Sequence, residues 1–296
     1  MPLHDIMFGY DWITANLSPP QSSRRDIYVY GSYLGASLAA SLALTETKPN
    51  EQMAVRGAAV FNGIYNWPTF LPDHPINKVK DSKLFDLLIP DDGGPAFRSM
   101  KQQAEYLFRE PADLFDPFAS PSLFFYSTGM TPPSEFSSSA PPSPLSKAID
   151  ALSLGETLTA ENLSADVDEK PPRKGYLAFP PRQSDMQIPD MLLLHENPPP
   201  PLTFPRRGRR MASSRKKRGE NNFATQANEL AALMRRSINR LELRERIKSE
   251  GEFEGWESEA DSRVQVTDVG RCDGDNGLGA HGEEAIKEWL AERMGS

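Results

Sequence analysis

The spacing of apolar and polar residues predicts alternating helices and strands in the first 61 positions. Apolar residues at helical spacing over 3–17 predict an amphipathic helix, which the prolines at 19 and 20 would end. Residues 26–30 form a short β-rich run, and the Ala/Leu-rich segment 36–46 favours a helix. A second apolar run at 54–61 follows, and this crossover length predicts parallel pairing of the two strands.

The later part of the chain predicts two more strands and several helices. Residues 122–126 are compatible with a short strand or a loop. Strand signals lie at 188–194 and 263–268, and helical spacing is found at 79–89, 96–109, 223–248 and 282–293. This order predicts an α/β fold, in which a mostly parallel open sheet carries helices on both faces.

Two segments differ in composition from the rest. Pro, Ser, Thr, Asp and Glu dominate residues 127–174, which predicts a disordered, low-complexity insertion. We therefore expect a first core part at 1–126, an insertion at 127–175 and a second core part at 176–296. The second part contains a loop at 197–222, where a run of prolines precedes a basic cluster.

Overall composition limits the classes of function. The net charge of −8 argues against a protein built as a whole to bind nucleic acid. A single cysteine excludes an internal disulfide and a CxxC metal site, and the four histidines are too scattered to indicate zinc. We expect no metal and no cofactor. No leader pattern and no run of about 20 apolar residues is present, so we expect an intracellular, cytoplasmic protein without a membrane span.

The turn between the first strand and its helix has the pattern of a nucleophile elbow. Gly31-Ser32-Tyr33-Leu34-Gly35 fits G-x-Nu-x-G, in which small residues two positions before and after the nucleophile avoid clashes in a sharp turn. In this register Tyr33 occupies the nucleophile position. A tyrosine hydroxyl has an ordinary pKa near 10 and a bulky ring, which makes it a poor nucleophile for acyl transfer. Taking Ser32 as the nucleophile would instead place Tyr30 and Leu34 where small residues are needed.

This turn and its flanks resemble a known family. The stretch from Tyr28 to Glu46 resembles the elbow and following helix of the lipase/esterase-like α/β-hydrolases, and most of all fungal hydrolase-like proteins in which the elbow serine is replaced. Asp116-Pro-Phe-Ala-Ser-Pro121 is similar to a D-P-x-x-S-P stretch late in that family. Residues 188–194 with 226–237, and the closing segment 282–293, resemble its last strands and helices.

The resemblance implies positions for a catalytic triad. Its chain order is nucleophile, acid and histidine, which falls on Tyr33, Glu196 and His281 in this chain. His281 is expected in a loop before the last helix, and His195 beside Glu196 is the weaker candidate for the base. The backbone around Gly31, Leu34 and Gly35 would form the elbow and the oxyanion contact.

Two departures from the family pattern affect the expected activity. The nucleophile is a tyrosine, and the family's first strands and His-Gly-Gly oxyanion loop have no counterpart in this sequence. The strand at 26–30 would then be a sheet edge, and either a protein partner would cover it or the sequence is a fragment. We expect a weakly active or inactive hydrolase-like protein whose ligand is a small-molecule ester or a protein partner.

Two alternatives remain open from the sequence. One is an active carboxylic-ester hydrolase that uses Ser32 with His281. The other is a nuclear or polyanion-binding protein, although the net charge makes nucleic acid an unfavoured partner. The second alternative rests on two basic clusters without an intervening acid: Arg206, Arg207, Arg209, Arg210, Arg215, Lys216, Lys217 and Arg218. A solvated loop balanced by the acidic stretch 250–261 explains the same clusters.

Overall fold

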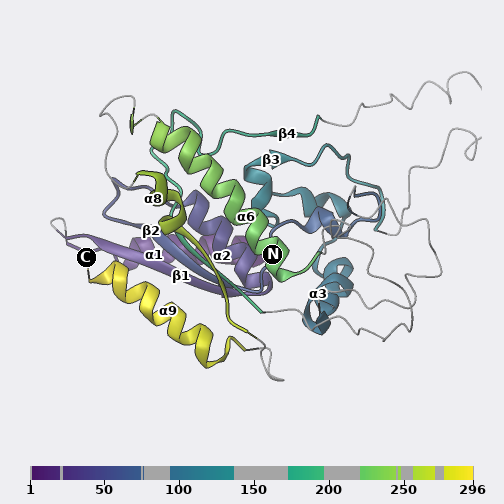
Figure 1. The fold of residues 1–296 in the computed structure, drawn as a ribbon, viewed down its shortest axis with the longest axis horizontal. Coiled ribbons are helices and arrows are strands. Elements are labelled where there is room, and N and C mark those ends of the chain that lie inside the picture. Colours follow the sequence, from purple (N-terminus) through teal and green to yellow (C-terminus); the bar gives the residue numbers. More distant parts are fainter. Residues whose placement is uncertain are drawn as a thin grey trace, which may run out of the picture.

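A four-stranded parallel sheet lies at the centre of the fold (Figure 1). The computed structural model describes residues 2–20, 23–74, 76, 94–136, 173–196, 221–244, 246–247, 256–270 and 277–295. The strands are β1 (Arg25–Ser32), β2 (Met53–Phe61), β5 (Asp190–His195) and β6 (Val264–Asp268), and they lie side by side in this order. The predicted mostly parallel α/β arrangement is confirmed.

Outside this sheet, the two-residue strands β3 (Tyr126–Ser127) and β4 (Gly175–Tyr176) form a separate antiparallel pair.

Helices connect and cover the four strands of the central sheet. The α-helices are α1 (Pro2–Asn16), α2 (Leu34–Thr45), α3 (Gly94–Leu107), α6 (Phe223–Ser237), α8 (Trp256–Arg263) and α9 (Gly279–Met294). Short 3₁₀ helices span Trp67–Phe70, Pro111–Phe115 and Pro121–Phe124, and a π-helix continues α6 over Ile238–Leu243.

Some predicted elements differ from those observed. The helix expected over 223–248 changes to π-helical hydrogen bonding after residue 237, and part of the acidic stretch 250–261 forms α8. Residues 122–126 are mostly a 3₁₀ turn, because Pro121 occupies its first position and favours that backbone. The helix predicted over 79–89 lies outside the described residues, as do residues 137–172 of the predicted insertion.

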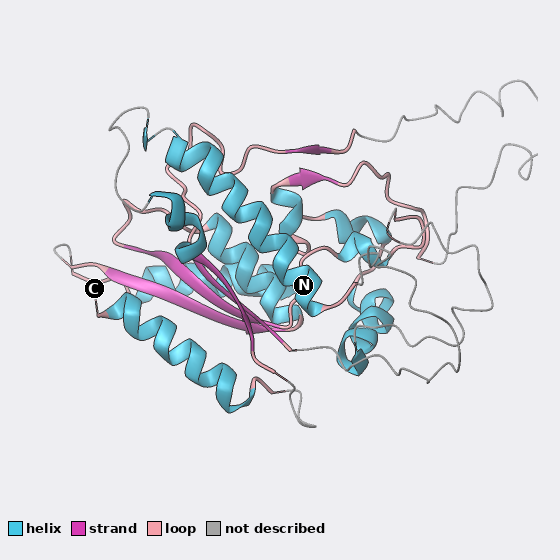
Figure 2. Cartoon of the chain, in the orientation of Figure 1, coloured by secondary structure: helices cyan, strands magenta, loops and turns pink. Residues whose placement is uncertain are grey.

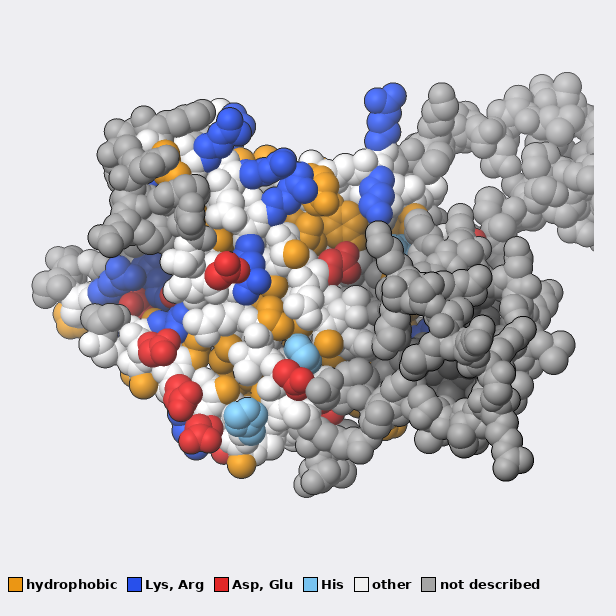
Figure 3. All heavy atoms as spheres, in the orientation of Figure 1, with side chains coloured by type: hydrophobic (Ala, Val, Ile, Leu, Met, Phe, Trp, Pro, Cys, Tyr) orange, Lys and Arg blue, Asp and Glu red, His pale blue; other side chains and the backbone are white. Residues whose placement is uncertain are grey.

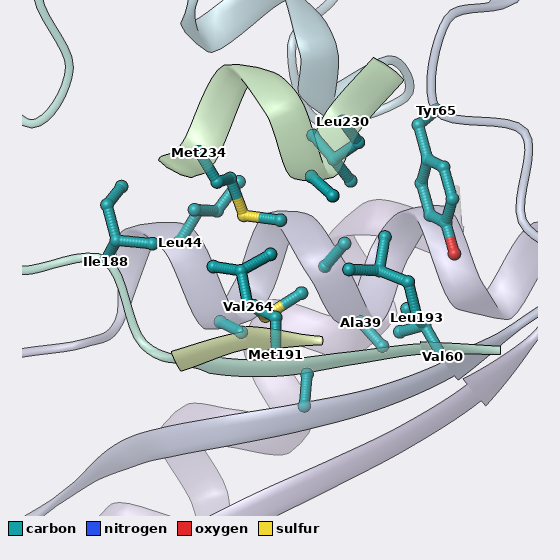
Figure 4. Close-up of a cluster of buried hydrophobic side chains, with 14 of the residues drawn as sticks. Ala39, Leu44, Val60, Tyr65, Ile188, Met191, Leu193, Leu230, Met234 and Val264 are labelled. Atoms are coloured by element: carbon teal, nitrogen blue, oxygen red, sulfur yellow. The ribbon is translucent and has the colours of Figure 1, made fainter. Parts of the chain in front are cut away.

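One face of the sheet packs against α2 and α6. Alternate side chains of the strands, including Val60, Met191 and Leu193, are fully buried there. The close-up in Figure 4 shows them meeting Leu230 and Met234 of α6. Small residues on α2, such as Ala36 and Ala40, let that helix approach the strands closely.

The opposite face is covered by α9 (Figure 2). Phe61, Leu192 and Leu194 point to this side, where Trp289 of α9 is only 3% exposed. Gly57 of β2 makes room for the indole, because a Cβ on Gly57 would lie 2.8 Å from Trp289 Cη2. The described helices therefore cover both faces of the sheet, as the sequence predicts.

Strand β1 is an edge of the sheet. It pairs with β2 on one side, and Tyr33 N–H, just beyond its end, donates to Phe61 O at 2.9 Å. Because peptide groups alternate along a strand, Tyr28 and Tyr30 direct their backbone groups away from β2. Helix α1 packs on the α2 side of this edge and leaves Phe8 and Trp12 exposed. Both observations agree with the predicted edge position of residues 26–30.

Candidate functional site

The turn after β1 is strained at the predicted nucleophile position. Tyr33 has φ 53° and ψ −116°, a conformation that residues with a side chain rarely adopt. It lies directly between the end of β1 and the start of α2. A strained residue at a sharp strand-to-helix turn is the backbone geometry of a nucleophile elbow. The structure thus shows a positive φ at the centre of the turn predicted from residues 31–35, and the nucleophile elbow itself stays a prediction.

Gly31 is required by this turn, whereas Gly35 is not required in the way the sequence suggested. A Cβ on Gly31 would lie 2.2 Å from Gly35 O and 2.6 Å from Gly35 C. A Cβ on Gly35 would meet no atom within 4 Å. The sequence predicted that a side chain at either position would clash. This prediction is wrong for Gly35, because an added Cβ would point into open space. Leu34, which begins α2, is partly buried against an aromatic cluster.

The Tyr33 ring packs between two other aromatic rings. Its centroid is 5.9 Å from that of Phe61 at the end of β2, and 5.9 Å from that of Phe223 at the start of α6. Both pairs are edge-to-face, the arrangement that aromatic quadrupoles favour. Tyr33 therefore contributes to the packing that joins the sheet to α6, a role for which serine is too small.

Ser32 is the last residue of β1. It forms a side-chain hydrogen bond with Tyr30, two residues earlier, and Tyr30 also feels the negative charge of Glu283 in α9. Burial raises the pKa of Tyr30, and the Ser32 contact opposes this rise. Ser32 thus belongs to the face that α9 covers, near the β1 edge.

His281 lies in the first turn of α9, not in a loop before the helix as the sequence predicted. The Gly-rich sequence around it suggested a loop, but the left-handed residue Gly279 (φ 71°) already begins the helix. His281 lines a depression together with Gln265 and Thr267 of β6, which is the edge opposite β1. In the described part of the chain, no hydrogen bond joins His281 to Ser32.

Glu196 and His195 lie at the carboxyl end of β5. The Glu196 N–H donates to Asn62 Oδ1 at 2.9 Å, and His195 Nδ1 lies 3.3 Å from Glu196 O. Asn62 is fully buried and has φ 50°. Burial raises the pKa of Glu196, while the Asn62 amide opposes that rise. This direction is opposite to that expected of a carboxylate paired with a cationic histidine.

Replacing Glu196 tests whether it serves as a triad acid. Because burial disfavours its charged form, Glu196→Gln is expected to raise the thermal midpoint slightly at pH 7. The gain should shrink as the pH falls through the pKa of Glu196 and the wild-type carboxyl becomes neutral. Thermal unfolding of both proteins at pH 7 and pH 4 measures this. A loss of stability at pH 7 would instead indicate a carboxylate held by a positive partner.

Sequence reasoning missed Asn62 and Phe223 as parts of this site. Asn62 directly follows the second predicted strand, and asparagine is enriched at positive φ, so its position was a usable signal. Nothing local indicates that Phe223 would contact Tyr33 across 190 residues. The eight basic residues predicted as a polyanion site, Arg206 to Arg218, lie outside the described residues.

Comparisons of the chain with protein-family models, curated proteins and solved structures find no match. Among the described residues, no three His, Cys, Asp or Glu side chains come together in a way that could hold a metal ion. No helix in the described ranges has the length and apolarity to cross a bilayer.

Proposed function

We propose that this chain is an α/β-hydrolase-like protein that acts through binding and has little or no carboxylic-ester hydrolase activity. The observation that carries the proposal is Tyr33, which takes a strained elbow backbone while its ring packs against Phe61 and Phe223. The turn thus supports the family resemblance, and the side chain is used for packing. Tyr33 in the nucleophile position supports weak or absent acyl transfer.

The positions of the histidines support the same proposal. The carboxyl ends of β1 and β5 are two strand spacings apart, or about 10 Å, and His195 is buried beside Glu196. His281, on α9, lines a depression with Gln265 and Thr267 of β6. We therefore expect a serine at position 33 to lack the adjacent general base that activates a hydroxyl.

A fluorophosphonate probe, which reacts with activated serines, tests this proposal. We expect no labelling of the wild-type chain and none of Tyr33→Ser, because His195 is buried beside Glu196 and His281 lines a depression with residues of β6. Gel fluorescence and mass spectrometry of the labelled peptides measure the result. Tyr33→Phe, which keeps the ring, should remain folded and serves as the control for packing.

The alternative hydrolase makes a different prediction for the same experiment. Labelling of wild-type Ser32, abolished by His281→Ala, would contradict the proposal and support an active esterase that uses these two residues. Labelling of Tyr33→Ser alone would show that a base is already in place and that the wild-type chain lacks only the serine nucleophile. Either result would indicate a catalytic function and contradict the proposed binding function.

The edge strand β1 is our candidate for the binding surface. Backbone groups of Tyr28 and Tyr30 point away from β2, and Phe8 and Trp12 of α1 are 70% and 59% exposed. An edge strand next to exposed apolar side chains suits addition of a partner strand. A protein partner therefore fits the edge better than a small-molecule ester, which has no row of backbone donors and acceptors to offer.

A further inference from the structure

A groove lined by arginines lies between β4 and the C-terminal part of α6 with its π-helical continuation. It encloses about 440 Å³, and its lining residues include Arg182, Arg236, Arg240 and Arg244 but no carboxylate. Figure 3 shows Lys and Arg side chains gathered in this region beside an apolar area. The chain as a whole has a net charge of −8, so the positive charge of this groove is opposite in sign to that of the whole protein.

Among the described residues, these four arginines differ from their neighbours in having no acidic partner. On the other side of the same helix, Arg235 pairs with Asp261 at 3.0 Å and Arg246 with Glu259 at 3.1 Å. In the described part of the chain, none of the four groove arginines forms an ion pair. Arg236 instead lies over the ring of Tyr176, 3.4 Å from its centroid. Arg182, Arg240 and Arg244 are exposed. The N–H donors of these three guanidinium groups are therefore open to solvent.

Apolar side chains form the rest of the groove. Phe125 is buried at its base, Leu233 and Leu241 are partly buried, and Tyr176 and Leu177 are 62% and 53% exposed. Exposed apolar side chains next to unpaired cations are typical of a surface that receives a ligand with both characters. The π-helix at Ile238–Leu243 passes through this groove, and such segments often occur at functional sites.

The spacing of the arginines suits an extended acidic peptide. Arg236, Arg240 and Arg244 follow one another at intervals of four residues along the helix. Four residues span about 6 Å where the helix is α-helical. Alternate residues of an extended peptide are about 6.6 Å apart. Carboxylates at alternate positions would therefore meet successive guanidinium groups, while the intervening apolar side chains would face Tyr176 and Leu177. Guanidinium groups bind carboxylates with two parallel hydrogen bonds.

A nucleic acid suits the groove less well. Its bases would need free aromatic faces for stacking, and the face of Tyr176 is already covered by Arg236. The net charge of −8 would also repel a long polyanion before it reached the groove. A short peptide with a few carboxylates experiences less of that repulsion.

We infer that the groove between β4 and the α6 helix binds an acidic, apolar peptide segment of a partner protein in extended conformation. The site is separate from the elbow at Tyr33, and it does not depend on whether the chain has hydrolase activity. Its binding energy would come from the Arg182, Arg240 and Arg244 contacts and from burial of apolar side chains against Leu177 and Tyr176.

Fluorescence anisotropy with a labelled decapeptide of alternating Glu and Leu tests the inference on the full chain. Binding is expected at about 50 mM salt and should weaken at 300 mM, because the charges are exposed. The double variant Arg240→Glu/Arg244→Glu should weaken binding at least about tenfold, since it replaces two attractions by two repulsions. Replacing Glu by Gln in the peptide should abolish binding to the wild-type chain.

Two control variants separate the groove from general charge effects. Lys101→Glu/Lys287→Glu makes the same change of net charge on α3 and α9, and it should leave peptide binding unchanged. A variant with glutamines at all eight basic positions between Arg206 and Arg218 should also retain binding. The inference is overturned if the peptide does not bind, if binding follows either control variant, or if a single-stranded oligonucleotide displaces the peptide through the same arginines.

Discussion

Gly31→Ala is expected to destabilise the fold by about 3 kcal/mol or more, one of the largest effects of a single methyl group in this chain. The added Cβ would lie 2.2 Å from Gly35 O and 2.9 Å from Ala36 N. These are backbone atoms at the start of α2, so no side-chain rotation can relieve the contact. The turn would have to open, and α2 would lose its close approach to β1 and β2.

Gly35→Ala is the matched control for this prediction. It adds the same methyl group four residues later, where no atom lies within 4 Å, and it replaces glycine inside a helix. Stability should rise by up to about 1 kcal/mol, because alanine has the higher helix propensity. Chemical denaturation of both variants measures the difference. Equal effects of the two substitutions would show that the turn does not have the described geometry.

The turn was predictable because its constraint is local. Gly31 and Tyr33 are two residues apart, and the steric requirement of a sharp strand-to-helix connection acts within five positions. The parallel pairing of β1 and β2 was also predictable, since the helical segment between them is long enough to return the chain to the same end of the sheet. Local pattern and chain connectivity therefore determined most of the sheet.

The rest of the site depends on contacts between distant parts of the chain. The ring of Phe223 meets Tyr33, and the side chain of Asn62 accepts from the Glu196 backbone, across gaps that no spacing rule covers. The loop predicted at His281 was wrong, because α9 begins at Gly279, two residues before it. The resemblance gave the order of the residues but not the distances between them.

The arginine groove could not be predicted for a related reason. The sequence shows arginines on the helix from residue 223 onward, but it does not show which of them have partners. Arg235 and Arg246 find their acids on α8, whereas Arg240 and Arg244 face β4. Only the packing of α8 against one side of the helix makes the other side cationic.

Trp289→Ala is expected to destabilise the fold by about 3–5 kcal/mol, the range for deleting a buried large aromatic side chain. Trp289 is 3% exposed, and its ring meets Tyr28 edge-to-face with centroids 5.8 Å apart. It is the largest α9 side chain against the sheet, so its loss should also raise amide hydrogen exchange throughout α9. Denaturant unfolding and hydrogen exchange measure the two effects.

Trp12→Ala and Trp289→Phe are the matched controls for Trp289→Ala. Trp12 is 59% exposed, so its truncation should change stability by less than about 0.5 kcal/mol. Trp289→Phe keeps a ring and removes an indole N–H that has no hydrogen-bond partner among the described residues, so it should cost less than alanine. If Trp289→Ala proved as mild as Trp12→Ala, α9 would not cover the sheet in solution. The face formed by Phe61, Leu192 and Leu194 would then need another cover, because apolar side chains of that size do not remain exposed together on a stable monomer.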